Sequence, residues 1–328
     1  RNIAIGNGSM ENGTMTGADN TAVGHNALNL LGAANYNTAV GAYTLDSTTT
    51  GSNNIAVGRS ALGLNTTGAS NTAVGTFALD ANTTASNNTA LGYAALTANT
   101  TGGDNVSIGS GTMGQNLTGA QNIAVGTNSL ANTTASNNTA VGNAAGHSIT
   151  SGTNNLTLGM DAGRSGSPGG NIVTGSNEIA LGDENIASAA IQVDWTVASD
   201  ARDKTDFTAL DLGLEFVKDL KPVTYKWDKR SKYGDKTADD YDLTAQTPDG
   251  THKEDWLDIG FKAQEVEALE IAAGYNKDNS TNLVSSHTGD GKQMGLQYSK
   301  FVPILVKAIQ EQNALIEALT ARITELEG

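Results

Sequence analysis

A serine and a lysine that could do chemistry together stand five positions apart in this sequence, at Ser199 and Lys204. A serine hydroxyl is a weak nucleophile and needs a base to activate it. Lysine can be that base only where burial or neighbouring charge lowers its pKa toward neutral. By itself the spacing favours an ordinary polar loop, so a catalytic interpretation needs support from the rest of the chain.

A second group of candidate residues is aromatic. Tyr43, Phe77 and Tyr93 each follow a glycine by one or two positions within a repeated pattern, at a place where each repeat should turn a corner. Rings arranged in this way could stack on sugars and bind a receptor. The simpler alternative, aromatic side chains that are exposed or lie at a subunit interface, stays open.

Several kinds of site are not indicated. The chain has no cysteine, which excludes disulfides and thiolate chemistry. Its four histidines have no metal-ligand spacing, and the repeats contain neither a calcium-binding nonapeptide pattern nor the paired carboxylates of a glycosidase. A phosphate-binding loop is also missing. We therefore expect no metal and no cofactor.

The charge of the chain limits its partners. The formal net charge of −15 argues against nucleic acid, which requires a basic face, and against an acidic membrane surface. No stretch has the length and apolar character of a membrane span, and no signal peptide is visible, so we expect no membrane insertion. The chain begins with Arg1. We therefore expect a processed product or a piece of a longer chain, whose upstream attachment segment is missing.

The first half of the chain is an internal repeat. Motifs such as T-A-V-G end at Gly24, and the following motif glycines recur at intervals of 17 residues, six times in succession, up to Gly126. Disorder gives no reason to keep a valine or isoleucine at such intervals. With 39 glycines and 5% aromatic residues, the chain suits a thin, stacked architecture better than a broad core.

The simplest geometry is one coil for every 17 residues, with parallel pairing between neighbouring coils at roughly 4.8 Å. Alternation within the short strands predicts that the apolar third residue, such as Val74, and the leucine of each Ala-Leu pair, such as Leu79, point inward, and that the small second residue points outward. Asparagines at equivalent positions should stack into a ladder: Asn54, Asn71, Asn88 and Asn105.

The composition changes near Trp195. Residues 1–195 contain three arginines and no lysine, whereas residues 196–328 hold the other 16 basic residues. We predict a mainly β protein: a parallel β-solenoid of about ten 17-residue coils over residues 1–195, and an α+β domain over 196–328.

The second domain has conventional patterns. Helical spacing predicts a helix over 210–220 and another over 263–269, while residues 222–227 and 258–261 read as strands. Residues 229–255 and 274–292 are polar and are expected to be loops. From Leu305 to Leu326 apolar residues step by 4 and 3, with one glutamine among them, which predicts a coiled-coil helix over about 302–327. Isoleucine at a with leucine at d favours a dimer, and a single helix packed on its own domain is the alternative.

Two family resemblances follow from these motifs. Over about residues 1–185 the repeats resemble the heads of trimeric autotransporter (YadA-like) adhesins, whose repeats are shorter, and those of phage tail-fibre proteins. Residues 199–328 resemble the C-terminal intramolecular chaperone of phage endosialidase tail spikes and tail fibres. The blocks that carry this second resemblance are S-D-A-R-D-K at 199–204, L-K-P-V-T-Y-K-W at 220–227, G-F-K-A-Q-E-V at 260–266, Tyr298, and 302–311.

The resemblance to the chaperone implies a chemistry. In that family the module trimerises, guides folding of the preceding β-structure and cuts the chain before the motif serine. The residues in the matching positions are Ser199 as nucleophile and Lys204 as base, with the scissile bond between Ala198 and Ser199. Asp200 and Arg202 are expected to hold the turn. Any enzymatic activity would be a single self-cleavage, with no turnover of an external substrate.

Three functions compete. The leading one is a distal phage tail fibre in the virion, a homotrimer that binds a host-surface glycan or protein and joins other tail or baseplate proteins through its missing N-terminal part. The second is a bacterial trimeric adhesin at the cell surface with a non-cleaving cap. The third is a polysaccharide-degrading spike, which the lack of carboxylate clusters in the repeats disfavours.

Overall fold

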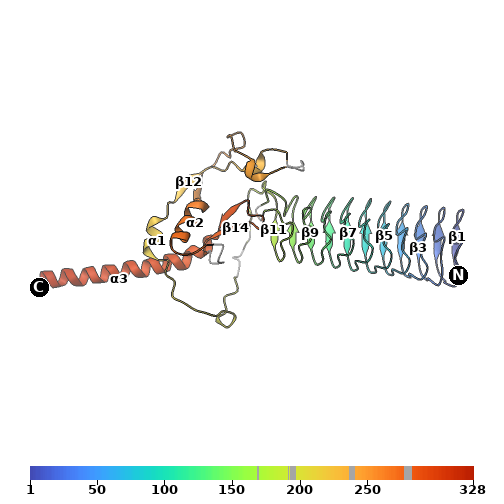
Figure 1. The fold of residues 1–328 in the computed structure, drawn as a ribbon, viewed down its shortest axis with the longest axis horizontal. Coiled ribbons are helices and arrows are strands. Elements are labelled where there is room, and N and C mark those ends of the chain that lie inside the picture. Colours follow the sequence, from blue (N-terminus) through green and yellow to red (C-terminus); the bar gives the residue numbers. More distant parts are fainter. Residues whose placement is uncertain (168–169, 191, 193–196, 236–240, 277–282) are drawn as a thin grey trace. The chain divides into compact units, whose positions relative to one another are not determined.

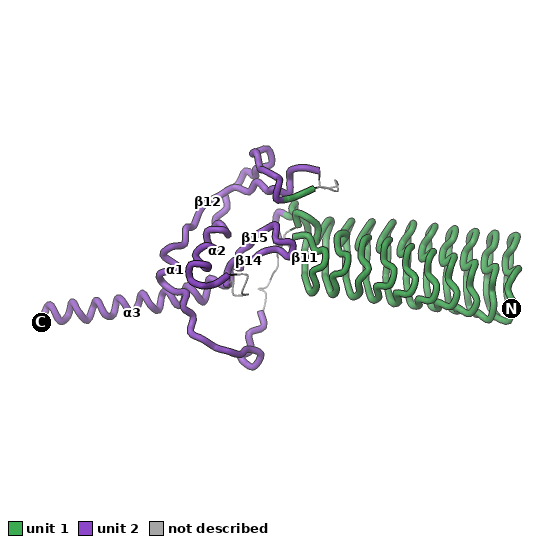
Figure 2. The backbone as a smooth tube through the Cα atoms, in the orientation of Figure 1, with its two compact units in different colours: residues 1–186, 236–243 green, residues 187–235, 244–328 purple. Residues whose placement is uncertain are grey.

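A computed structural model describes residues 1–167, 170–190, 192, 197–235, 241–276 and 283–328. The chain divides into two compact units, which Figure 2 distinguishes by colour: residues 1–186 with 236–243, and residues 187–235 with 244–328. The predicted boundary at Trp195 lies outside the described residues, so the domain limits 1–195 and 196–328 stay predictions.

The first unit is the predicted parallel β-solenoid, which is confirmed. Its strands form one parallel sheet in which each strand pairs with the next in the sequence (Figure 1). Each strand has three residues: Ile3–Ile5 (β1), Thr21–Val23 (β2), Thr38–Val40 (β3), Ile55–Val57 (β4), Thr72–Val74 (β5), Thr89–Leu91 (β6), Val106–Ile108 (β7), Ile123–Val125 (β8), Thr139–Val141 (β9), Leu156–Leu158 (β10) and Ile179–Leu181 (β11).

The coils are held in register by a buried asparagine ladder. The backbone N–H of Asn71 donates to Oδ1 of Asn54 at 2.9 Å, and the amide group of Asn71 donates to the carbonyl of Ala85 at 2.9 Å. The same contact repeats at every coil that carries the asparagine, so the predicted ladder is confirmed and extends over most of the unit. Each amide satisfies backbone groups that are buried away from water. The ladder comprises Asn20, Asn37, Asn54, Asn71, Asn88, Asn105, Asn122, Asn138 and Asn155.

The predicted inward face of the strands is wrong. Ala73, the middle residue of β5, is fully buried, while its neighbours Thr72 and Val74 are partly exposed, and the middle residue is likewise the buried one in β2 to β11. The reason is the narrow interior of a 17-residue coil. The leucine of each Ala-Leu pair, such as Leu79, is fully buried and occupies that interior, which leaves room for only a small side chain from the strand.

Close stacking also explains the motif glycines. Gly75 has a φ of +135°, and a Cβ placed there would lie 2.3 Å from the carbonyl oxygen of Gly92 in the next coil. A side chain at this position would therefore collide with backbone, in a conformation that L-residues rarely adopt. The 17-residue repeat thus requires glycine at the end of each strand.

The second unit is a small α+β fold. Its helices are α1 (Leu214–Asp219), α2 (Ala263–Ala272) and α3 (Phe301–Glu327); β12 (Val223–Tyr225) pairs with β13 (Asp258–Gly260) and β14 (Ser285–His287) with β15 (Met294–Leu296), both antiparallel. Short 3-10 turns are η1 (Ala201–Asp203), η2 (Arg230–Lys232), η3 (Leu243–Ala245) and η5 (Tyr298–Lys300). The core consists of Leu212, Phe216, Val266, Val284, Phe301 and Ile304.

The helices of this unit are tied together by carboxylates. Glu311 of α3 accepts the backbone N–H of Leu214 at 2.7 Å, which satisfies a free donor at the start of α1 and lowers the pKa of Glu311. Gly213 permits this approach, because a Cβ there would lie 2.2 Å from the Glu311 carboxylate. Glu270 of α2 is fully buried and accepts from the backbone of Leu283, Val284 and Ser285.

The structure also corrects the predicted elements. The helix expected over 210–220 is shorter, and the helix expected over 263–269 continues to Ala272. Strand β14 lies within 274–292, which was expected to be a loop because Ser285–His287 contains no apolar residue. That strand is anchored instead by Glu270. Residues 236–240 and 277–282 of the two predicted loops lie outside the described residues.

The C-terminal helix is confirmed, and its apolar seam is exposed. From Gln312 to the C-terminus every residue is exposed, and Ile309, Ile316 and Leu319 of the heptad seam keep 63%, 52% and 61% of their surface. The seam therefore does not pack on its own domain beyond the first three turns of α3. None of the helices in the described part of the chain has the length and apolarity needed to cross a membrane.

Candidate functional site

The segment that carries Ser199 and Lys204 is a single tight turn. Asp200 caps η1, and its carboxylate accepts the backbone N–H of Arg202 at 2.9 Å. The backbone N–H of Lys204 then donates to the carbonyl of Ala201 at 3.3 Å. This reversal of the chain brings the two ends of the S-D-A-R-D-K block together.

The turn is reinforced by an ion pair. The guanidinium of Arg202 contacts the Asp200 carboxylate with both Nε and a terminal nitrogen, the latter at 2.6 Å. These hydrogen bonds hold the pKa of Asp200 below its ordinary value and raise the pKa of Arg202. Asp200 and Arg202 thus occupy the place expected of residues that hold the turn.

Ser199 and Lys204 meet across this turn. Nζ of Lys204 lies 2.6 Å from Oγ of Ser199, within hydrogen-bonding distance. The peptide bond between Ala198 and Ser199 is adjacent to that hydroxyl. The geometry is what proton transfer between a nucleophile and its base requires. The catalytic assignment of these two residues stays a prediction.

The surroundings of the pair are open to solvent in the single chain. Each described residue from Asn185 to Ala209 is exposed, including Val197 at 78% and Phe207 at 71%. Val197 and Phe207 are therefore large apolar side chains that remain in contact with water.

The three aromatic candidates lie at one corner of the solenoid, on three coils, of which those of Phe77 and Tyr93 are successive. Tyr43 and Phe77 are the second residue after a motif glycine, and Tyr93 is the first. Phe77 and Tyr93 contact each other edge to face at 6.3 Å between ring centroids. Tyr43 contacts His25 instead, at 5.0 Å, and the guanidinium of Arg59 lies 5.5 Å from the Phe77 ring.

His25 and Arg59 were not assigned from the sequence to this group of candidates. They could have been found from the way the coils stack, because the second corner residue of one coil lies over the first corner residue of the preceding coil. The backbone N–H of Tyr43 donates to the carbonyl of His25, and that of Phe77 to the carbonyl of Arg59. The pairs 25/43 and 59/77 are therefore neighbours in space.

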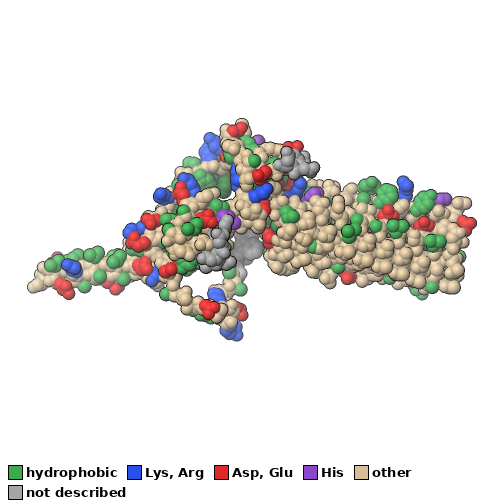
Figure 3. Space-filling view, in the orientation of Figure 1, with side chains coloured by type: hydrophobic (Ala, Val, Ile, Leu, Met, Phe, Trp, Pro, Cys, Tyr) green, Lys and Arg blue, Asp and Glu red, His purple; other side chains and the backbone are tan. Residues whose placement is uncertain are grey.

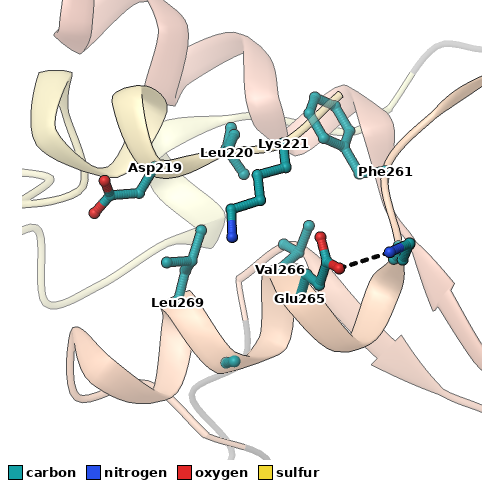
Figure 4. Close-up of a pocket in the computed structure, with 9 residues that line it drawn as sticks. Asp219, Leu220, Lys221, Phe261, Glu265, Val266 and Leu269 are labelled. Carbon is teal, nitrogen blue, oxygen red and sulfur yellow. Dashed lines mark hydrogen bonds and ion pairs between the residues drawn. The ribbon is translucent and has the colours of Figure 1, made fainter. Parts of the chain in front are cut away.

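A small cavity of about 200 Å³ lies between α2 and the segment that joins α1 to β12 (Figure 4). Apolar atoms of Leu220, Phe261 and Leu269 line it, and Lys221 extends along its wall. Lys262 and Glu265 form an ion pair at 2.8 Å at its edge. The cavity shares no residue with the turn at 199–204. Within the described residues, no group of three or more His, Asp or Glu side chains is placed to hold a metal.

Comparison with known proteins addresses the second unit. Residues 199–275 match the family model described as Chaperone of endosialidase, and the match begins at Ser199. This segment is therefore similar to a chaperone module. It contains the turn at 199–204, α1, the β12–β13 pair and α2, and a chaperone of this family implies a homotrimer. No curated protein and no solved structure matches the chain.

The match supports the resemblance to the chaperone on which the dyad was predicted. The resemblance of the repeats to adhesin heads and phage tail fibres stays a prediction. So does the assignment of Tyr43, Phe77 and Tyr93 to receptor binding.

Proposed function

We propose that the chain is the distal part of a phage tail fibre, in which the chaperone module assembles three copies, guides folding of the solenoid and then separates from it by a self-cleavage between Ala198 and Ser199. The observation that carries this proposal is the 2.6 Å contact between Ser199 Oγ and Lys204 Nζ at the first residue of the matched chaperone family. The completed fibre would bind the host surface and remain with the virion.

Assembly is supported by the exposed seam of α3. Its apolar residues form a stripe along one side of the helix, and such a stripe is stable in water only when other helices cover it. Three helices from three copies would bury the seam, and Gln312 would then lie within it. The exposed seam residues are Leu305, Ile309, Ile316, Leu319, Ile323 and Leu326.

The outward face of the solenoid strands supports the same assembly. Because alanine occupies the inward position, valine, isoleucine and leucine point away from the coil and form an apolar stripe parallel to the stack, with Val40 at 38%, Ile55 at 46% and Leu91 at 45% exposure. Figure 3 shows hydrophobic side chains distributed along the solenoid surface. Copies joined through such stripes would remove this apolar area from water.

The proposed cleavage uses only residues of the turn. Neutral Lys204 accepts the proton of the Ser199 hydroxyl while Oγ attacks the carbonyl carbon of Ala198. The bond from that carbon to the Ser199 nitrogen breaks, the nitrogen takes up the proton, and an ester joins Ala198 to Ser199 Oγ. Water then hydrolyses the ester, which leaves a carboxylate on Ala198 and restores the hydroxyl. Asp200 and Arg202 hold the two reacting groups at contact distance.

The exposure of Ser199 and Lys204 in the separate chain predicts that cleavage occurs only after assembly. Burial between assembled copies would remove the surrounding water, and desolvation favours the neutral form of an amine, which is the form that acts as a base. Cleavage would then follow correct assembly and would not occur in the separate chain.

The test is denaturing mass spectrometry of the purified chain and of Ser199→Ala and Lys204→Gln. We expect two fragments in the parent, residues 1–198 and 199–328, and a single intact chain in each variant. Lys300→Gln, a lysine variant outside the turn, serves as control and should cleave like the parent. An intact chain in a parent preparation that is trimeric by light scattering would refute the self-cleavage and leave a non-cleaving chaperone.

A further inference from the structure

Five planar side chains lie at one corner of neighbouring coils of the solenoid. His25, Tyr43, Arg59, Phe77 and Tyr93 stand on five successive coils, each at one of the two corner positions after the motif glycine. The planar residue alternates between the first corner position (His25, Arg59, Tyr93) and the second (Tyr43, Phe77). We call these five residues the planar stripe.

The alternation makes a repeat of two coils. Because a second corner residue lies over the first corner residue of the preceding coil, His25 pairs with Tyr43 and Arg59 pairs with Phe77. The ring of Phe77 also contacts the ring of Tyr93 on the next coil. With about 4.8 Å between coils, equivalent planar groups recur about every 10 Å along the solenoid.

The aromatic residues are not explained by the fold. Tyr43 and Phe77 have φ of +59° and +60°, in the left-handed region that disfavours bulky side chains. The same corner position on other coils holds residues suited to this region, such as Asn26, Gly111 and Asn128. Tyr43 and Tyr93 also remain 40% and 60% exposed, so they contribute little to the core. An aromatic ring at this corner therefore adopts an unfavourable backbone conformation without a compensating contribution to the core.

Arg59 gives the planar stripe a positive charge. It is one of three arginines in residues 1–195. Arg1 and Arg164 each contact a carboxylate, at 3.9 and 2.6 Å. Among the described residues, no carboxylate pairs with Arg59, which is exposed with its guanidinium over the Phe77 ring. Its N–H groups are therefore available to oxygen acceptors of a ligand.

We propose that the planar stripe binds an extended polysaccharide that runs parallel to the solenoid axis. The apolar faces of its sugar rings pack against Tyr43, Phe77 and Tyr93, and hydroxyl or carboxylate oxygens accept hydrogen bonds from Arg59. Figure 3 shows hydrophobic, basic and histidine side chains gathered along one edge of the solenoid. This inference rests on the proposed function, of which it specifies the receptor class and the coils that contact it.

The alternative occupant is a second copy of the chain, which would cover this edge if the trimer assembled through it instead of through the strand face. Hydroxyl-radical footprinting of the assembled protein separates the two. We expect Tyr43, Phe77 and Tyr93 to be oxidised at rates similar to that of Tyr36, which lies in a different turn and is 63% exposed. Strong protection of the three stripe residues relative to Tyr36 would place them between copies and overturn the proposal.

Binding is tested with the assembled protein on an array of purified bacterial capsular polysaccharides and O-antigens. We expect at least one polysaccharide to bind, and Tyr43→Ala and Phe77→Ala each to weaken that binding by about tenfold. Arg59→Gln should weaken it by a similar factor. Tyr36→Ala is the matched control and should bind like the parent.

Two outcomes would overturn the inference. One is an array on which the assembled parent binds nothing, and the other is binding that the three stripe variants leave unchanged. Neither bears on the chaperone, because the trimeric state and the cleavage at Ala198–Ser199 are measured on the same preparations by light scattering and mass spectrometry.

Discussion

Nζ of Lys204 lies 2.6 Å from Oγ of Ser199, and both side chains are exposed in the single chain. If assembly buries this pair, a chain that cannot assemble should keep the contact and still fail to cleave. We expect Ile316→Asp with Leu319→Asp, two changes in the exposed seam of α3, to yield an intact monomer. Light scattering and denaturing mass spectrometry measure the two properties together.

The control for the seam variant is Glu317→Gln, which changes a charge on the same helix turn outside the seam and should assemble and cleave normally. A monomeric seam variant that cleaves as fast as the parent would show that the single chain is sufficient for the reaction.

The ion pair within the turn should affect cleavage more than stability. Arg202→Ala removes the guanidinium that holds the Asp200 carboxylate, so Ser199 and Lys204 lose a fixed separation, and the cleavage rate should fall by about tenfold or more. Because the pair is exposed, the midpoint of thermal unfolding should not change measurably. An unaltered cleavage rate in this variant would show that the pair does not position the dyad.

The same ion pair predicts a pH dependence. Since the pKa of Asp200 is lowered by its hydrogen bonds with Arg202, the carboxylate stays charged below the pH at which an ordinary aspartate protonates. The cap on η1 is therefore present above the ordinary pKa and is lost only as the pH falls through the lowered value. The chemical shift of the Arg202 amide, followed by NMR during acid titration, should show its transition below the pH at which an ordinary aspartate protonates. A midpoint at the ordinary value would contradict the contact.

Glu270 should be essential to the chaperone module. Its buried carboxylate accepts three backbone N–H groups and the hydroxyl of Ser285, and Glu270→Ala leaves these donors unsatisfied. We expect a loss of about 3 kcal/mol or more in the free energy of unfolding, measured by urea denaturation. Glu265→Gln, a change at a partly exposed position on the same helix, should leave the urea midpoint unchanged. Equal midpoints for the two variants would refute the role of Glu270.

The inverted strand face gives a matched pair of variants in β5. Ala73→Leu adds three carbons to a filled interior and should destabilise the solenoid by about 1–3 kcal/mol. Val74→Leu enlarges an outward side chain and should cost much less. Thermal unfolding followed by circular dichroism compares them, and a larger loss for Val74→Leu would restore the originally predicted orientation.

The repeats made the solenoid and its asparagine ladder predictable, because a glycine every 17 residues fixes both the coil length and the position of Asn71 within it. The direction of Val74 was not predictable from alternation alone. Alternation separates the two faces of a strand without indicating which of them is inside, and the choice depends on the space that Leu79 leaves.

In the second unit the periodic helices were predictable and β14 was not. Ser285–His287 has no apolar pattern, and its position is set by Glu270, a residue 15 positions earlier. At the site, the motif predicted which residues come together at 199–204. The contact of Arg59 with Phe77 depends on the offset between stacked coils, which a list of repeats does not contain.

The in-register stack also makes the length of the solenoid a heritable variable. Each coil repeats the backbone contacts of the coil before it, so a duplicated 17-residue unit would insert between two neighbours and extend the solenoid by about 4.8 Å without disturbing either end. The register already absorbs one shorter interval, from Ile123 to Thr139, and two longer ones, from Ile3 to Thr21 and from Leu156 to Ile179. Recombination between repeats could therefore change the length of the solenoid, while the planar stripe and the contact of Ser199 with Lys204 stay intact.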